Sequence, residues 1–234
     1  MYRFSIAQDA QNPERFGISN LEWTDDSLGE PLWSLNGEKI EKIRNRLICD
    51  MCRVVLYTAN MPVQEYERYV QFFRKAHLIG VENVMLRYPA IAGASDEAIR
   101  RIIAIGAAFS IRILFCFEAE HMEEFGFERY GALRSEDTGL VYDCREFLKQ
   151  GKLPYRGVLH TSKFRSDVVF LRIQDYVAHS LQPVLPMHGN CEIKDAASGL
   201  LARRYEGYFS FSKYGDGLAT QDVIREFCQM LCQM

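Results

Sequence analysis

Short apolar runs alternate along the chain with longer stretches of helical periodicity. The runs are rich in β-branched, aromatic and large aliphatic residues, and most are continuously apolar, which is typical of strands buried on both faces. They are Arg3–Ala7, Asn20–Trp23, Arg53–Tyr57, Asn83–Tyr88, Arg112–Glu118, Gly139–Tyr142, Val168–Ile173 and Gly207–Ser212. The pattern therefore predicts eight strands.

Most gaps between the runs predict amphipathic helices. In 38–52 the expected buried stripe is Ile40, Ile43, Leu47 and Ile48, and in 63–79 it is Tyr66, Val70, Phe73 and Leu78. Ser95, followed by Asp96, Glu97 and Ile99, is typical of an N-cap for a helix ending near Phe109.

Strands that alternate with helices predict a parallel sheet. Eight such units in 234 residues fit one α/β domain over 1–234, a closed (β/α)8 or TIM barrel. An open doubly wound sheet is the alternative, because periodicity does not report closure. Only Gln8–Ser19 separates the first two runs, so the first covering helix is expected to be missing or irregular. An apolar gap there would favour a homodimer, whereas an irregular loop packed over the wall would not.

Composition narrows the functional classes. No apolar stretch approaches the roughly 20 residues needed to span a bilayer, and Asp9 stands where a secretory signal would continue apolar, so we expect a cytoplasmic protein without a membrane partner. A net charge of −3 with interspersed signs argues against nucleic acid as a partner. The seven cysteines are expected to be reduced. Two cysteine pairs, 49/52 and 228/232, have helical spacing, which favours buried hydrophobes over a zinc site.

Polar residues gather where the predicted strands end. The active site of a parallel barrel lies at the carboxyl ends of its strands. Reading those ends in order gives Gln8, Glu22, Tyr57 to Asn60, Arg87, Glu118 to His121, Asp143, Arg172 with Asp175, and Ser212 with Lys213. A single charged residue at a strand end is often a solvated loop start, but a set of them at one barrel mouth indicates a site.

Several segments carry a family resemblance, and they follow the family's order over nearly the whole chain. The segments are GISNLEW (17–23), AHLIGVENVMLR (76–87), IGAAFSIRILFCFEAE (105–120), GLVYDCREF (139–147), VVFLRIQD (168–175), PMHGNCEI (186–193) and YEGYFSFSKYG (205–215). Together the chain resembles the xylose isomerase-like barrel proteins, the sugar isomerases and 3-epimerases related to endonuclease IV.

The resemblance implies a divalent cation such as manganese, magnesium, cobalt or zinc. Its ligands would be a glutamate after strand five, an aspartate after strand six, a histidine after strand seven and a glutamate after strand eight. Glu118 and Asp143 match the first two, whereas Arg172 stands at the histidine and Ser212, followed by Lys213, at the second glutamate. Glu146 stands where many members carry a further histidine.

Two of the four ligand positions are therefore lost, and we predict no metal or other cofactor. An arginine is always protonated and cannot act as a ligand. Arg172 and Lys213 instead bring two positive charges, the number that a divalent ion would supply beside Glu118 and Asp143. We interpret them as an internal replacement for the metal.

The predicted function is that of a sugar isomerase or epimerase acting on a small carbohydrate. Its catalytic residues would be Glu118, as general base, with Asp143, Arg172 and Lys213, the cations stabilising an enediolate-like charge. The predicted substrate contacts are Glu22, Tyr57, Arg87, Asp175 and His188. A guanidinium would suit a phosphate or carboxylate on the ligand.

Two other functional classes compete with this prediction. A pseudoenzyme that binds a carbohydrate or a protein partner is the alternative. A nuclease like endonuclease IV is disfavoured, because the histidine and acidic metal ligands of that chemistry are not evident and the charge is wrong for nucleic acid.

Overall fold

Eight parallel strands form a closed barrel in the order β1, β10, β7, β6, β5, β4, β3, β2, with helices between them. This computed structural model describes residues 2–7, 17–211 and 218–234. The closed barrel confirms the prediction and excludes the open sheet. The first run, β1 (Arg3–Ala7), pairs in parallel with the last, β10 (Tyr208–Phe211), as closure requires.

The chain groups into two compact units. The first comprises Met1–Ala7, Phe117–Met122 and Leu140–Met234, and the second comprises Gln8–Cys116 and Glu123–Gly139. The predicted gap between the first two strands falls mostly on residues 8–16, outside the described residues, so the irregular first helix and the homodimer stay predictions.

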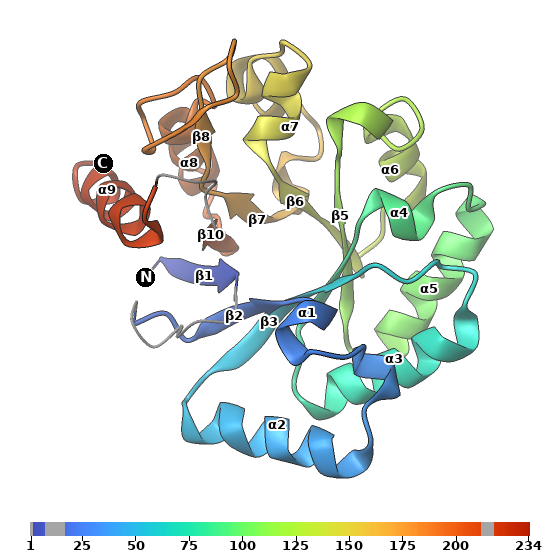
Figure 1. Cartoon of the computed structure of the whole chain (residues 1–234). Coiled ribbons are helices and arrows are strands. Elements are labelled where there is room, and N and C mark those ends of the chain that lie inside the picture. Colours follow the sequence, from blue (N-terminus) through green and yellow to red (C-terminus); the bar gives the residue numbers. More distant parts are fainter. Residues whose placement is uncertain (1, 8–16, 212–217) are drawn as a thin grey trace. The chain divides into compact units, whose positions relative to one another are not determined.

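In the second unit, the three longest helices lie on the outer side of four strands (Figure 1). The strands are β2 (Asn20–Trp23), β3 (Arg53–Ala59), β4 (Asn83–Leu86) and β5 (Arg112–Cys116). The helices are α1 (Asp25–Leu28), η2 (Leu32–Ser34), α2 (Gly37–Cys49), α3 (Tyr66–Leu78), α4 (Tyr88–Ile91), α5 (Asp96–Ala108) and α6 (Phe127–Leu133). Ser95 caps α5 by accepting the backbone N–H of Ala98, as predicted.

The predicted buried stripes of α2 and α3 are partly wrong. On α2 only Ile40 and Leu47 are buried, and Ile48 is 63% exposed. On α3 the buried face is made by Tyr69, Phe72, Phe73 and Ala76. Val70 and Leu78, which the sequence assigned to the core, are 44% and 47% exposed. A regular helical spacing fits two adjacent faces, and only packing decides between them.

The first unit contains the other barrel strands, of which β6 (Thr138–Tyr142) begins in the second unit, and β7 is Val168–Arg172. Its helices are η3 (Ala119–His121), α7 (Cys144–Lys149), η4 (Pro154–Leu159), η5 (Arg165–Asp167), α8 (Ile193–Leu201) and α9 (Thr220–Cys232). A small antiparallel pair, β8 (Asp175–Tyr176) and β9 (Pro183–Val184), was not predicted.

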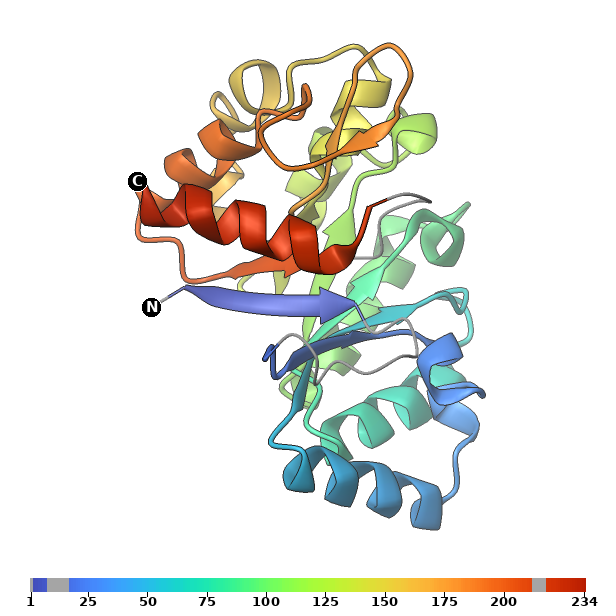
Figure 2. The same ribbon diagram turned by 60° about the vertical axis from the view of Figure 1, so that its left-hand side comes forward.

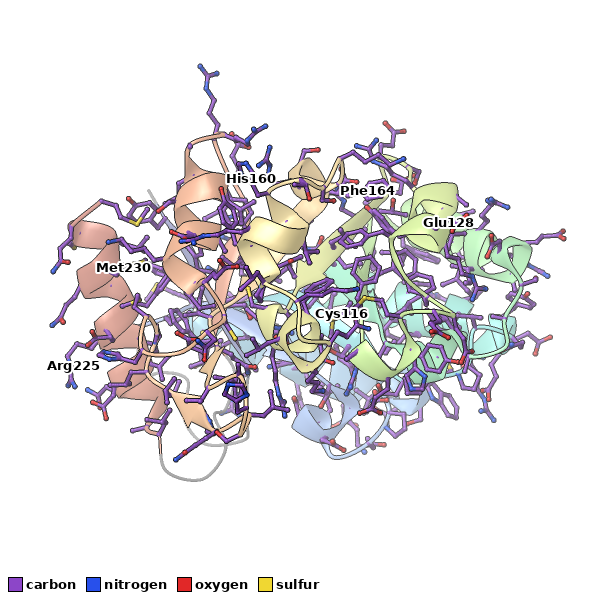
Figure 3. The ribbon with its side chains drawn as sticks, turned by 90° about the horizontal axis from the view of Figure 1, so that it is seen from above. Cys116, Glu128, His160, Phe164, Arg225 and Met230 are labelled. Atoms are coloured by element: carbon purple, nitrogen blue, oxygen red, sulfur yellow. The ribbon has the colours of Figure 1, made fainter. Side chains whose placement is uncertain are left out.

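Helix α9 packs along β10 (Figure 2). Phe227 contacts the rings of Phe209 and Phe211, with centroids 5.1 and 5.9 Å away. Met230 faces inward and is 4% exposed, whereas Arg225 is exposed (Figure 3). These contacts place Phe209 and Phe211 on the outer face of β10, so Tyr208 and Ser210 face the barrel interior.

Among the described residues no helix is both long and apolar enough to cross a membrane. All seven cysteines are free thiols, as predicted. Cys144 and Cys191 are buried, but Cys49 and Cys232 are exposed, so their predicted role as buried hydrophobes is wrong.

Candidate functional site

Arg172 ends β7 on the inner face of the first unit. It lies opposite Ser210 of β10, which in turn lies opposite Ser5 of β1. The Arg172 Nη1 donates a hydrogen bond to Ser210 Oγ. Both serines are completely buried. A cationic side chain is therefore held by a polar row inside an otherwise apolar wall, where its charge is weakly screened.

Toward the amino ends of these strands, aromatic rings fill the interior. Phe170 and Tyr208 stack with their centroids 4.8 Å apart. The Arg3 guanidinium lies 4.0 Å from the centre of the Tyr208 ring and donates to its hydroxyl. This aromatic layer lies on the amino-terminal side of Arg172, because the Tyr208–Phe170 pair precedes the Ser210–Arg172 pair along the two strands.

Asp143 follows Tyr142, which lies opposite Leu171 of β7, so it stands beside Arg172 at the ends of two neighbouring strands, where it caps α7. Its Oδ1 accepts the backbone N–H of Arg145 at 3.0 Å. Burial raises the pKa of the Asp143 carboxyl, the charge of Glu146 raises it further, and the charge of Arg172 lowers it. The structure thus brings two of the predicted catalytic residues together, with a carboxyl that holds its proton more tightly than an exposed aspartate.

Glu118 precedes Ala119, whose backbone N–H and carbonyl groups both form hydrogen bonds to side chains of α7 and its C-cap. The Glu146 Oε2 accepts the N–H of Ala119 at 3.0 Å, and the Gln150 Nε2 donates to its carbonyl at 2.9 Å. Lys149 pairs with Glu146 at 2.8 Å. The helix that Asp143 caps therefore also fixes the backbone next to Glu118.

Arg145 is a charged neighbour of the site that sequence reasoning missed. Its guanidinium lies 4.8 Å from the centre of the Tyr176 ring. Its Nε is buried without a hydrogen-bond partner among the described residues. The guanidinium charge also lowers the pKa of Asp143. The sequence gives no signal for Arg145, because its contact is with Tyr176 of β8, a strand that the sequence did not predict.

Asp175 has a structural role in place of the predicted substrate contact. The residue is 1% exposed. Its Oδ1 accepts the N–H groups of Tyr176 and Cys191, and its Oδ2 accepts that of Gly189, each at 2.9 Å. A side chain at position 189 would collide with this carboxylate. Asp175 therefore anchors the loop before α8.

The remaining predicted residues of the first unit lie apart from this cluster or beyond the described chain. The His188 side chain is 61% exposed, with its Nε2 3.7 Å from Glu226 Oε1 on α9. Ser212 and Lys213 lie outside the described residues.

Three predicted residues belong to the second unit. Glu22 is 5% exposed in β2 and pairs in register with Leu56. Arg87 is exposed at the end of β4, where it caps α4. Tyr57 is fully buried, packs edge-on against Phe72 and donates to Asp25 at 2.6 Å. Its ring lies between strand and helix, so the structure gives Tyr57 a packing role in place of the predicted substrate contact.

No family model matches the sequence, and no curated protein matches it. Solved structures do match its fold. A xylose isomerase domain protein from Planctomyces limnophilus has a TM-score of 0.69 at 10% identity over 99% of this chain and 93% of its own. The D-psicose 3-epimerase of Clostridium cellulolyticum has a TM-score of 0.65 at 9% identity, over 96% of this chain and 90% of its own. Endonuclease IV from Thermus thermophilus has a TM-score of 0.63 at 15% identity, over 100% of this chain and 99% of its own.

The resemblance to the xylose isomerase-like barrels is confirmed at the level of the fold. The metal ligands that this resemblance implies do not fit the residues present. The described residues contain no group of three histidine, cysteine, aspartate or glutamate side chains able to hold an ion. Arg172 faces inward at the position of the implied histidine.

Proposed function

We propose that this chain isomerises or epimerises a small carbohydrate beside Glu118 and the carboxyl ends of β6 and β7, with fixed cations in place of a metal. The observation that carries the proposal is Arg172, held by the buried Ser210 next to Asp143. The similarity in fold to an epimerase and to a xylose isomerase domain protein supports the substrate class.

The proposed reaction moves one proton next to a carbonyl. Glu118 removes the proton from the carbon that carries the hydroxyl, and the electron pair moves onto the carbonyl oxygen. Arg172 stabilises the negative charge that develops on that oxygen, with Lys213 as the second predicted cation. Asp143 supplies a proton to the oxygen, which its raised pKa favours. In isomerisation, Glu118 returns its proton to the neighbouring carbon, while the former alcohol oxygen loses its proton to Asp143 and becomes the carbonyl. In epimerisation, the original carbon takes a proton from solvent on its opposite face, while the first oxygen returns its proton to Asp143 and becomes the carbonyl again.

The alternative is a non-catalytic carbohydrate-binding protein. The loss of two implied metal ligands favours it, since the metal would polarise the substrate. Nuclease activity is not proposed, although endonuclease IV shares the fold, because among the described residues no metal-binding group suits that chemistry.

Deuterium exchange separates these proposals. The purified chain is incubated in D2O with a panel of aldoses, ketoses and their phosphates, with either a chelator or manganese, and carbon-bound deuterium is measured by NMR. We expect incorporation in one sugar without added metal. Glu118→Gln should slow it by at least about a hundredfold, and Arg172→Met should also slow it. Arg225→Met, on the exposed face of α9, is the matched control and should change nothing.

Two outcomes would count against catalysis. A sugar that binds by calorimetry without exchanging deuterium would establish the binding protein. Absence of binding by every sugar would remove both proposals.

A further inference from the structure

A groove runs between α2 and α3 in the second unit. It encloses about 590 Å³, within the range of ligand and peptide sites. Gly37, Ile40, Glu41 and Arg44 line it from α2, and Gln71, Arg74, Lys75 and Leu78 line it from α3. A Cβ atom added at Gly37 would meet nothing within 4 Å, so the groove is open at the start of α2.

The cations that line the groove lack carboxylate partners. Within the described part of the chain, neither Arg44 nor Arg74 forms an ion pair. Lys75 donates to the carbonyl oxygen of Trp33 and to no carboxylate there. Glu41 is the acidic residue on the same wall. The groove therefore carries a net charge of two positive units, obtained as three cations less one carboxylate.

Cations elsewhere on the same helices are paired. Lys42 pairs with Glu38 at 2.6 Å, and Arg46 with Asp50 at 3.4 Å. Lys39 and Arg68 pair with Glu30 and Glu65. On these two helices, the cations without a carboxylate partner among the described residues are therefore the three that line the groove. Their positive charge would attract an anionic partner.

Apolar side chains accompany this charge. Leu78 lies in the groove and is 47% exposed, and Val70 on the same helix is 44% exposed. Ile48 at the end of α2 is 63% exposed. Apolar side chains exposed beside a groove on neighbouring helices are typical of a protein interaction surface. A polyanion such as nucleic acid would match the charge but leave these residues in water.

We propose that the α2–α3 groove binds an acidic amphipathic helix of a protein partner. Apolar side chains of the incoming helix contact Leu78 and the small exposed part of Ile40, and its carboxylates pair with Arg44, Arg74 and Lys75. This is the helix-in-groove mode of recognition. The proposal does not depend on the catalytic one, because the groove and the cluster around Arg172 belong to different parts of the chain.

The test uses a fluorescent synthetic peptide with leucines on one helical face and glutamates on the other, measured by anisotropy against the full chain. We expect binding that weakens with added salt. Arg44→Glu with Arg74→Glu should weaken it at least about tenfold, equivalent to about 1.4 kcal/mol. Lys42→Glu with Arg46→Glu reverses two paired charges on α2 outside the groove and should leave affinity within about twofold. Leu78→Asp should weaken binding without touching either arginine.

Several results would overturn the proposal. One is equal loss of affinity in the groove variants and the matched control. Another is equal binding of a peptide with lysines in place of the glutamates. Tighter binding of duplex DNA than of the acidic peptide would assign the groove to a phosphate backbone. Self-association that Arg44→Glu with Arg74→Glu abolishes would assign it to a second copy. Thermal unfolding of each variant checks that the fold is intact.

Discussion

Asp143 combines a structural and a chemical role in one side chain. Its Oδ1 caps α7, and its carboxyl lies between the negative charge of Glu146 and the positive charges of Arg172 and Arg145. Burial is the largest of the influences that raise its pKa. Burial raises the pKa of Cys144, Tyr142 and Tyr176, and the charge of Asp143 raises it further, so these three groups remain neutral. Asp143 is therefore the residue at which a pH dependence is expected.

The raised pKa predicts the sign of that dependence. Folded Asp143 binds its proton more tightly than the unfolded chain, so stability falls as pH rises from its ordinary pKa of 3.8 to its folded value, and is constant above it. Asp143→Asn keeps the helix cap and removes the ionisation. The variant should therefore gain stability relative to the native chain over this interval, measured by urea unfolding at a series of pH values.

Asp143→Ala serves as the comparison for this prediction. It should follow the same pH trend but lose about 1 kcal/mol at every pH, because alanine cannot cap the helix. A difference between Asp143→Asn and the native chain that stays constant with pH would contradict the proposed environment.

The Asp175 carboxylate is expected to stabilise the fold. Asp175→Ala leaves three backbone N–H groups without their acceptor, so we expect a loss of about 3 kcal/mol or more in the free energy of unfolding. Asp195→Ala, which removes a carboxylate paired with Arg156 on the surface, should cost less than about 1 kcal/mol. Similar stability of the two variants would return Asp175 to the list of ligand-binding candidates.

At the scale of elements, α7 organises the candidate site. It is six residues long, and its stability comes from its contacts. Phe147 stacks on Tyr142 of β6 with the ring centroids 4.9 Å apart, while Glu146 and Gln150 hold Ala119. The helix thereby links the end of β6 to the segment that follows Glu118.

This link predicts how exchange at Ala119 depends on α7. Glu146→Ala removes the acceptor of the Ala119 N–H, so hydrogen exchange at that amide should accelerate by about tenfold or more. Glu146→Gln retains an acceptor oxygen and should change exchange little. Lys149→Met removes only the ion pair and is the matched control. Unchanged exchange in Glu146→Ala would show that the segment is held by other contacts.

In our proposal, the positive charges of Arg172 and Lys213 take the place of a divalent metal ion beside Glu118 and Asp143. Arg172 beside Asp143, with Lys213 as the second predicted cation, would leave little field to attract a metal cation. We expect the purified chain to carry no stoichiometric divalent metal by elemental analysis. Arg172→His with Ser212→Glu restores the implied ligand types and should create manganese or cobalt binding by calorimetry, with Lys213→Ala added to remove the remaining cation.

One equivalent of tightly bound metal in the unmodified chain would contradict this prediction. Absence of binding in the restored variants would show that the ligand geometry, and not only the ligand types, has changed.

The eight barrel strands and most of the longer helices can be predicted from the sequence, because continuous apolar runs and helical spacing are local properties. The short pair β8–β9 cannot. It also singled out Asp143 and Arg172, since residues at strand ends can be read directly. Closure was decided by the pairing of β1 with β10, which joins residues at opposite ends of the chain. Similarly, the roles of Asp175 and Tyr57 depend on which distant groups approach them.

For α2 and α3, the sequence indicates the helices, but the tertiary structure decides which face is buried. Their spacing indicated helices correctly, yet Ile48, Val70 and Leu78 were assigned to the core and are exposed. A helix with apolar residues on two adjacent faces buries the one that its neighbours cover, and the neighbours are specified only by the tertiary structure. The tertiary structure alone therefore reveals the groove, because a groove is the space between two elements and is encoded in neither.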